Sequence, residues 1–351
     1  MAKVLPPFRK VTLDFKDRAV ADALADVAAQ TGLVLEYANC STDAPITLSL
    51  REASPLQALD EICRKAGSLG YRCQGRDDDN PFSGERPSKI VFQDNAFVDF
   101  PAAYVRHYRL RITQVTLTKT NSFKSEQAQA SLSLEFGWTP DVHPESFRDF
   151  QVSEIQDDRG RSLLAEEKGP RVMFAHRMRH WGRAGAAFQT GLSFKYPEAD
   201  ARKIAVLKGR AVLRFAKEIR LFTLEKPSEA RGQAFDLEGT RIVVKDFQSV
   251  ENNHTLDLEV IRSGPPAPGE PDEMGNPYGL PFSMEDIEVV SESGRAMSRG
   301  YSSSSDGKKQ TLKLNFWSRD QQPVRLIRIP CVLSRFEDEA KFELKDIPLP
   351  K

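Results

Sequence analysis

The sequence predicts a multidomain protein in which a small α+β domain precedes two all-β domains. Three observations support this class. A strand–helix unit occurs twice between Val11 and Phe92, helical periodicity disappears from about Tyr104 onward, and the β-rich remainder contains two strand sets that resemble each other. With 351 residues, the chain has room for two or three domains, each with its own core.

The N-terminal repeat aligns Leu13–Leu24 with Leu48–Leu59 at a constant offset of 35 residues. Each copy begins with alternating apolar and polar residues, which predicts a strand with one buried face. An apolar stripe at helical spacing follows in both copies. Gly32 and Gly67 stand where a C-terminal glycine would end each helix, and Ser54 is suited to cap the second.

Further strands are expected at 33–37, 70–74 and 89–92. The resulting order is βαββαββ, in a domain that covers residues 1–97. We expect one small sheet with both helices on one face. The polar stretch 75–88 contains three successive aspartates, but it lacks the glycine and glutamate spacing of a calcium-binding loop and is predicted to be a solvated hairpin tip.

These residues resemble the short N-terminal domain shared by secretins and TonB-dependent receptors. The resemblance covers roughly residues 9–95 and depends on hydrophobic spacing in Val11-Thr-Leu-Asp-Phe, Leu33-Val-Leu-Glu-Tyr, Ile46-Thr-Leu-Ser-Leu and Pro55-Leu-Gln-Ala-Leu-Asp-Glu-Ile. In that family the domain is a periplasmic protein-interaction module without catalytic residues, so the resemblance implies binding and assigns no reactive site. The remaining length could hold neither a secretin pore domain nor a receptor barrel.

Charge and hydropathy exclude some partners. Lysine plus arginine equals aspartate plus glutamate at 50 each, which argues against nucleic-acid binding. No run of 18 apolar residues exists, so we expect no membrane span. Met1–Lys10 lacks the apolar core of a signal peptide, which leaves a cytoplasmic protein or a mature exported domain behind an added start. The resemblance favours the periplasm or cell envelope.

The four cysteines leave two alternatives open. Cys63 near the end of the second helix and Cys73 on the next strand could form a helix-to-sheet disulfide. Alternatively, Cys63 is a core residue, since free cysteine packs like a small apolar side chain.

Residues 104–226 and 234–351 are predicted to form two β-sandwiches joined by a linker at 226–233. Phe150–Ile155 parallels Phe282–Ile287, and 204–215 parallels 324–336, so we expect duplicated immunoglobulin-like domains. Asp157–Gly160 is predicted to be a hairpin turn. The stretches 263–281 and 302–309 are predicted loops.

The strongest candidate binding site is a basic and aromatic loop within the first sandwich. It could hold an acidic partner or a glycan, or its charges could simply be solvated. Its residues are Arg171, Arg177, Arg179, His180, Trp181 and Arg183. His176 and His180 stand four residues apart, but the flanking arginines would repel a metal cation.

No motif for a nucleophile, phosphate loop, dinucleotide site or metalloprotease is present, so neither an enzyme nor a cofactor is expected. Trp138, Trp181 and Trp317 could form a sugar platform, but Trp138 and Trp317 end corresponding strands, which favours a shared core or rim role. The prediction is therefore a non-enzymatic interaction or structural protein of the bacterial cell envelope, such as a periplasmic adaptor, which binds another protein or a second copy of itself. The alternative is a glycan- or peptidoglycan-binding or carbohydrate-active sandwich protein.

Overall fold

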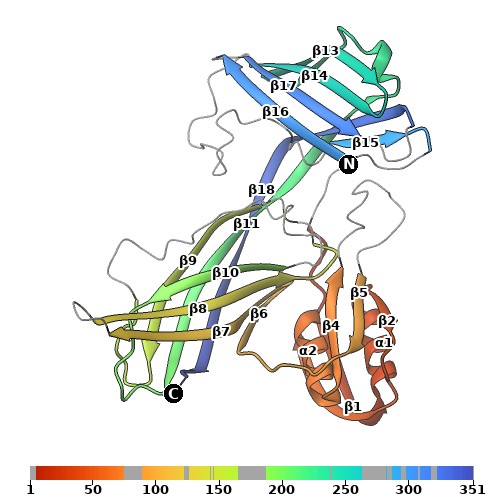
Figure 1. Cartoon of the computed structure of the whole chain (residues 1–351). Coiled ribbons are helices and arrows are strands. Elements are labelled where there is room, and N and C mark those ends of the chain that lie inside the picture. The colour runs from red at the N-terminus through yellow and green to blue at the C-terminus, as the bar shows by residue number, and fades with distance from the viewer. Residues whose placement is uncertain are drawn as a thin grey trace. The chain divides into compact units, whose positions relative to one another are not determined.

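A computed structural model describes residues 5–74, 89–121, 126–142, 144, 146–164, 187–237, 239–262, 282, 287–293, 298–306, 309–317 and 322–350. These residues are mostly β, as predicted, and they contain two α-helices (Figure 1). The chain forms two compact units. The larger unit takes its described residues from 5–215 and 337–350, and the smaller unit from 216–336.

The N-module, residues 11–94, has the predicted βαββαββ order. Its elements are β1 (Val11–Ala19), α1 (Val20–Thr31), β2 (Val34–Ala38), β3 (Pro45–Ala53), α2 (Pro55–Ala66), β4 (Leu69–Gln74) and β5 (Lys89–Asp94). The offset of the sequence repeat is kept, since α1 and α2 begin at Val20 and Pro55. The predicted caps are also present. The Ser54 hydroxyl accepts a hydrogen bond from the Gln57 amide at 3.1 Å, and Gly32 ends α1 with a φ of 75°.

The strands of the N-module form two sheets, so the prediction of one sheet with both helices on one face is wrong. Strand β1 pairs with β3, while β2, β5 and β4 form a separate sheet. Helix α1 contacts β1 and β2, and α2 contacts β3 and β4, so each helix packs on both sheets. The helices can do this because each buries more than a narrow stripe. In α2 the buried apolar side chains are Leu56, Ala58, Leu59, Ile62 and Cys63.

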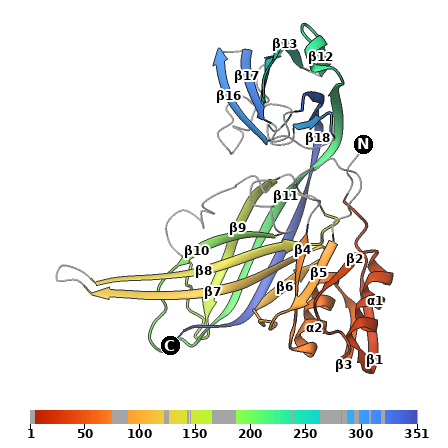
Figure 2. The same cartoon turned by 45° about the vertical axis from the view of Figure 1, so that its right-hand side comes forward.

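The first sandwich lies in the larger unit (Figure 2). One sheet has the order β10-β8-β7-β6, and strands β9, β11 and β18 supply the other. Alternate residues of β8 are buried, including Leu132, Leu134 and Phe136. The bounds are β6 (Ala102–Val105), β7 (Tyr108–Asn121), β8 (Glu126–Trp138), β9 (Ser146–Asp157), β10 (Ala187–Phe194), β11 (Lys203–Leu224) and β18 (Val324–Pro348).

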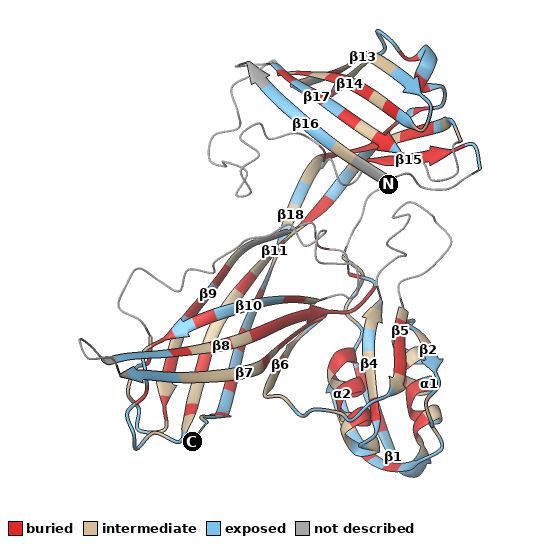
Figure 3. Ribbon diagram, in the orientation of Figure 1, coloured by how far each residue is buried: buried red, intermediate tan, exposed pale blue. Residues whose placement is uncertain are grey.

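The smaller unit holds the second sandwich, in which the strand residues 253–261 and 309–317 alternate between buried and more exposed positions (Figure 3). A five-stranded sheet has the order β12-β13-β14-β17-β16, and its core includes Leu256, Leu314 and Ile327. The bounds are η1 (Pro227–Glu229), β12 (Ala234–Leu237), β13 (Thr240–Val250), β14 (Asn253–Arg262), β15 (Glu288–Ser291), β16 (Ser298–Asp306) and β17 (Lys309–Trp317). Much of the predicted loop 302–309 is therefore strand, because an exposed edge strand needs no apolar alternation.

The two units do not follow the predicted boundaries 104–226 and 234–351. Strand β11 passes into the smaller unit at Ala216, and β18 passes into the larger unit at Glu337. The expected linker 226–233 is also incorrect, because it contributes Ala230 to the core of the smaller unit. The sequence contains separate apolar runs where the structure has continuous strands of 22 and 25 residues, because polar residues within a strand do not end it.

The strand order has an internal correspondence. In the sheet β15-β18-β11-β9, each half consists of one outer and one inner strand. The outer strand β9 corresponds to the outer strand β15, and the inner strand β11 corresponds to the inner strand β18. Likewise, β10-β8-β7-β6 matches β17-β14-β13-β12. The matched pair β11 and β18 contains the sequence segments 204–215 and 324–336 that resemble each other.

Candidate protein-interaction site

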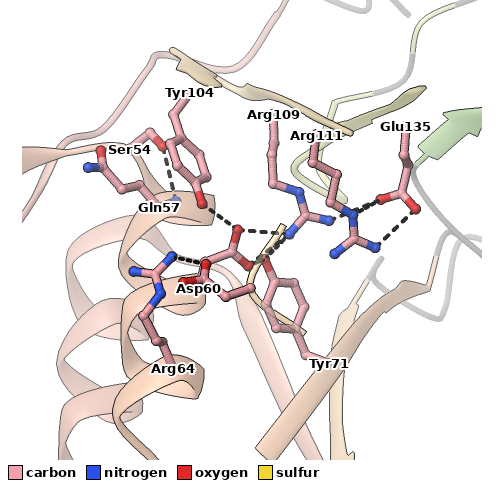
Figure 4. Close-up of polar contacts among 10 residues, drawn as sticks. Ser54, Gln57, Asp60, Arg64, Tyr71, Tyr104, Arg109, Arg111 and Glu135 are labelled. Carbon is pink, nitrogen blue, oxygen red and sulfur yellow. Dashed lines mark hydrogen bonds and ion pairs between the residues drawn. The ribbon is translucent and has the colours of Figure 1, made fainter. Parts of the chain in front are cut away.

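Asp60 lies at the centre of a polar network that joins the N-module to the first sandwich (Figure 4). It stands on α2 and is only 3% exposed. Its carboxylate accepts hydrogen bonds from the Tyr71 hydroxyl on β4 at 2.7 Å and the Tyr104 hydroxyl on β6 at 2.6 Å. Nη1 of Arg109 on β7 donates to both carboxylate oxygens, at 2.8 and 3.0 Å. Each oxygen of Asp60 therefore has two donors.

Arg109 connects Asp60 to a second carboxylate. Its Nη2 donates to Glu135 Oε1 on β8 at 3.2 Å, and Nε of Arg111 lies 2.9 Å from the same oxygen. The Arg109 guanidinium also lies 5.6 Å from the centre of the Tyr71 ring, a cation–π distance. Two arginines thus alternate with two carboxylates across the contact between α2 and β7.

The pKa values follow from this arrangement. Burial, together with Asp60, raises the pKa of Tyr71 and of Tyr104. Burial alone would lower the pKa of Arg109, but Tyr71, Asp60 and Glu135 reverse the effect and raise it. Burial would raise the pKa of Glu135, whereas Arg111 and Arg109 hold it below its ordinary value. The tyrosines are neutral and the Arg109–Glu135 pair is charged at neutral pH, a state that suits positioning rather than proton transfer.

This network fixes the second copy of the repeat, α2 with β4, against the first sandwich. Buried charges are tolerated only when opposite charges and hydrogen bonds compensate them, and removing one partner is costly. The contact therefore depends on a defined geometry. The contact occupies the surface of α2 and β4, and the equivalent surface of the first copy takes no part in it.

The other copy leaves an accessible surface at β2. This strand pairs with β5 in parallel register, from Val34 with Lys89 to Ala38 with Gln93, and it forms the edge of its sheet within the described part of the chain. Val34 is 41% exposed and Tyr37 is 45% exposed. On α1, the helix of the same copy, Ala25 and Ala29 are also exposed. An edge strand with exposed apolar side chains is a template for another strand.

The repeat makes the two surfaces comparable. Strand β2 corresponds to β4, and at the 35-residue offset Ala25 takes the place of Asp60 while Glu36 takes the place of Tyr71. The surface of the first copy thus lacks the carboxylate and phenol that dock the second copy. At β2 the exposed Val34 and Tyr37 instead flank Glu36, which forms an ion pair with Lys89.

The predicted basic loop lies outside the described residues. Arg171, Arg177, Arg179, His180, Trp181 and Arg183 all fall within 165–186, as does His176. The described tryptophans differ in exposure, since Trp138 is 7% exposed and Trp317 is 43% exposed. Their expected shared role is therefore wrong: Trp138 belongs to a core, whereas Trp317 lies on a surface.

All four cysteines are free, so the Cys63–Cys73 disulfide is not formed. Both residues belong to the N-module's apolar cluster, and burial raises the pKa of the Cys73 thiol to about 12.

Asp157–Gly160 forms the expected turn, in which Gly160 has a φ of 77°. Asp157 there accepts hydrogen bonds from the Arg159 and Arg161 amides at 2.9 Å.

Comparison with known proteins yields no match to a protein-family model, a curated protein or a solved structure. In the described ranges, no group of three or more His, Cys, Asp or Glu side chains could hold a metal ion. Nor does this part of the chain contain a helix long and apolar enough to cross a membrane. The function must therefore be argued from the surfaces themselves.

Proposed function

We propose that this protein is a non-enzymatic interaction protein of the bacterial cell envelope, and that its N-module binds a partner protein along β2. The observation that supports this proposal is the unequal use of the repeat. The α2–β4 copy is docked inside the chain through Asp60, while the α1–β2 copy presents Val34 and Tyr37 to solvent. The location in the cell envelope is proposed because the N-module resembles the short N-terminal domain of secretins and TonB-dependent receptors.

Strand addition is the binding mode that suits β2. The free edge of a sheet offers a row of backbone donors and acceptors, and alternating side chains supply selectivity. Tyr37 is held in place because its ring stacks on Phe92, with centroids 5.9 Å apart. Strand β2 has only five residues, so the partner contributes a short segment.

In this proposal the sandwiches are duplicated immunoglobulin-like domains that serve as spacers or further contact surfaces. The matching strand orders around β9 and β15, and the resemblance between 204–215 and 324–336, support the duplication. Two sandwiches derived from one ancestor would keep the same inner face and differ mainly in their loops.

A crosslinking pull-down from envelope extract tests this function, with the intact chain compared with a Val34→Lys, Tyr37→Lys double variant. Charge at the edge should reduce capture of the partner about tenfold or more, because two lysines disfavour a strand approaching β2. Val98→Lys is the control, since it places a lysine at an exposed valine outside the strands.

The control variant should capture the partner as the intact chain does, and unfolding temperatures should confirm that all three proteins are folded. Equal capture by the double variant and the intact chain would remove β2 as the contact. A chain that captures no protein, including a second copy of itself, would remove the adaptor function.

A further inference from the structure

The outward face of the five-stranded sheet in the smaller unit carries an ordered set of side chains. In β17, Leu312, Leu314 and Phe316 are buried, so the residues that alternate with them project outward. The cross-strand register continues this face over β13, β14 and β16. We call this surface the Trp317 face.

The first row of the Trp317 face runs through Val250, Asn253 and Trp317, which are register partners on adjacent strands. The indole ring of Trp317 lies over Gly300 on β16, where an added Cβ would be 3.6 Å from ring atoms Cζ3 and Cη2. The ring therefore lies against the sheet above Gly300, at the distance of an ordinary van der Waals contact. With 43% of Trp317 exposed, the ring also presents apolar surface to solvent.

The second row consists of Gln248, Thr255 and Asn315. The Thr255 hydroxyl donates to Asn315 Oδ1 at 3.2 Å, which leaves the amide NH₂ of Asn315 directed away from that bond. This row offers amide and hydroxyl groups, which can both donate and accept hydrogen bonds.

The third row, Asp246, Asp257 and Lys313, carries both signs of charge. Oδ2 of Asp246 accepts a hydrogen bond from the side-chain amide nitrogen Nε2 of Gln248 at 2.9 Å. Oδ1 of Asp257 is shielded from solvent and has no hydrogen-bond partner among the described residues. Because solvent does not reach this oxygen, a ligand lying on the sheet does not reach it either, and the row contributes the charges of Asp246 and Lys313 instead.

A sugar chain has the chemistry that these rows match. One side of a pyranose ring is a patch of C–H groups, which can stack on an indole, and its rim carries hydroxyls for amide and carboxylate groups. The mixed charges of the third row disfavour a polyanion such as nucleic acid. Rows on one face of a strand are about 7 Å apart, so a ligand that reaches from Trp317 to the third row must contain several sugar units.

We infer that the Trp317 face binds a neutral oligosaccharide of pyranose units. The indole of Trp317 provides the stacking platform, and the side chains of Asn315 and Gln248 hydrogen-bond to the sugar hydroxyls. This site is independent of the protein contact proposed at β2, since its residues belong to the other compact unit.

Calorimetric titration of the full chain with chitohexaose, cellohexaose and maltohexaose tests the inference. At least one of these probes should bind saturably, and Trp317→Ala should weaken its binding about tenfold or more. Tyr301→Ala is the control, because Tyr301 is exposed on the same sheet but faces Leu314, whose side chain points inward. This control should bind like the unaltered chain.

Asn315→Ala supplies a second variant that leaves the ring over Gly300 in place, and it should also weaken binding. Absence of binding by all three hexasaccharides at millimolar concentration would overturn the inference. So would unchanged affinity in a folded Trp317→Ala protein, which would show that the ring only covers Gly300. If Trp317→Ala does not fold, unchanged affinity in Asn315→Ala is decisive. The Val34→Lys, Tyr37→Lys variant should retain the affinity for sugar, which separates this result from failure of the protein-binding proposal.

Discussion

Arg109 is held between two carboxylates from different parts of the larger unit, Asp60 of the N-module and Glu135 of the first sandwich. Such a residue cannot be moved without leaving a charge unpaired. The docking of the N-module therefore depends on the charge state of the carboxylates that contact Arg109. Glu135 is the neighbour whose charge can be titrated without touching the N-module itself.

Glu135→Gln should destabilise the protein at neutral pH by about 2 kcal/mol, because hydrogen bonds to a charged group are lost. The pKa of Glu135 is lowered in the folded protein from an ordinary value of 4.5. Its contribution is therefore present above pH 4.5 and is lost as the pH falls through the lowered pKa. Denaturant unfolding of both proteins across this range measures the difference.

The gap between the two unfolding free energies should close below pH 4.5. A gap of constant size from neutral to acidic pH would show that the cost comes from the amide NH₂ of glutamine facing the arginine donors, and not from the lost charge of Glu135. Arg111→Lys offers a comparison, since it retains a positive charge and removes the two-nitrogen contact with Glu135.

At this scale, local features could be predicted from the sequence and long-range contacts could not. Ser54, Gly32 and Gly160 were assigned correctly because caps and turns depend on a few neighbouring residues. The Asp60–Arg109 contact joins residues 49 positions apart. Its only sequence signal is an aspartate between the apolar residues Leu59 and Ile62, and that pattern does not indicate a partner.

At the scale of elements, Gly209 of β11 allows two aromatic rings from neighbouring strands to meet. Phe150 of β9 and Phe342 of β18 stack with centroids 5.3 Å apart. In the sheet order, β11 lies between these strands. A Cβ on Gly209 would lie 2.5 Å from Phe342 Cζ and closer still to the Gln151 carbonyl oxygen.

Gly209→Ala should therefore destabilise the larger unit by about 1–3 kcal/mol through overpacking. Gly191→Ala on β10 is the matched control, because among the described residues no atom beyond its two chain neighbours lies within 4 Å of a Cβ at that strand position. Thermal unfolding of both variants measures the effect. Equal stability of the two would show that the sheet adjusts to the extra methyl group.

The elements of the repeat were predictable because two aligned copies support the same strand and helix boundaries. Strands β11 and β18 were divided incorrectly at their polar residues. Alternation along a strand indicates which side chains are buried, but it does not indicate which core buries them. The passage from one unit to the other therefore leaves no local signal in the sequence.

At the scale of the whole molecule, the larger unit is completed by a strand segment from beyond its main stretch of sequence, whereas the smaller unit takes its described residues from the single stretch 216–336. Residues 337–348 of β18 belong to the larger unit, where the Tyr108 hydroxyl donates to Asp338 at 2.7 Å and Leu349 donates its amide to the Arg202 carbonyl at 3.0 Å. Residues 216–224 of β11 supply Phe222 and Leu224 to the core of the smaller unit.

A chain that ends at Phe336 should lose more than about 5 kcal/mol of stability in the larger unit, because it lacks the buried side chains of Phe342, Leu344 and Ile347. Hydrogen exchange of β7 amides should report the loss. A synthetic peptide of residues 337–351 should restore protection, whereas the same peptide with serine at those three positions should not. Unchanged protection in the shortened chain would contradict the assignment of this segment to the larger unit.

The return of residues 337–348 to the larger unit also sets an order of events during synthesis. Domains generally fold as they leave the ribosome, the N-terminal ones first. Here residues 5–215 emerge early, but the segment that completes their sheet is made only after the whole of 216–336. The unit whose translation begins first is thus completed last, and until then its incomplete sheet must remain soluble beside the growing chain.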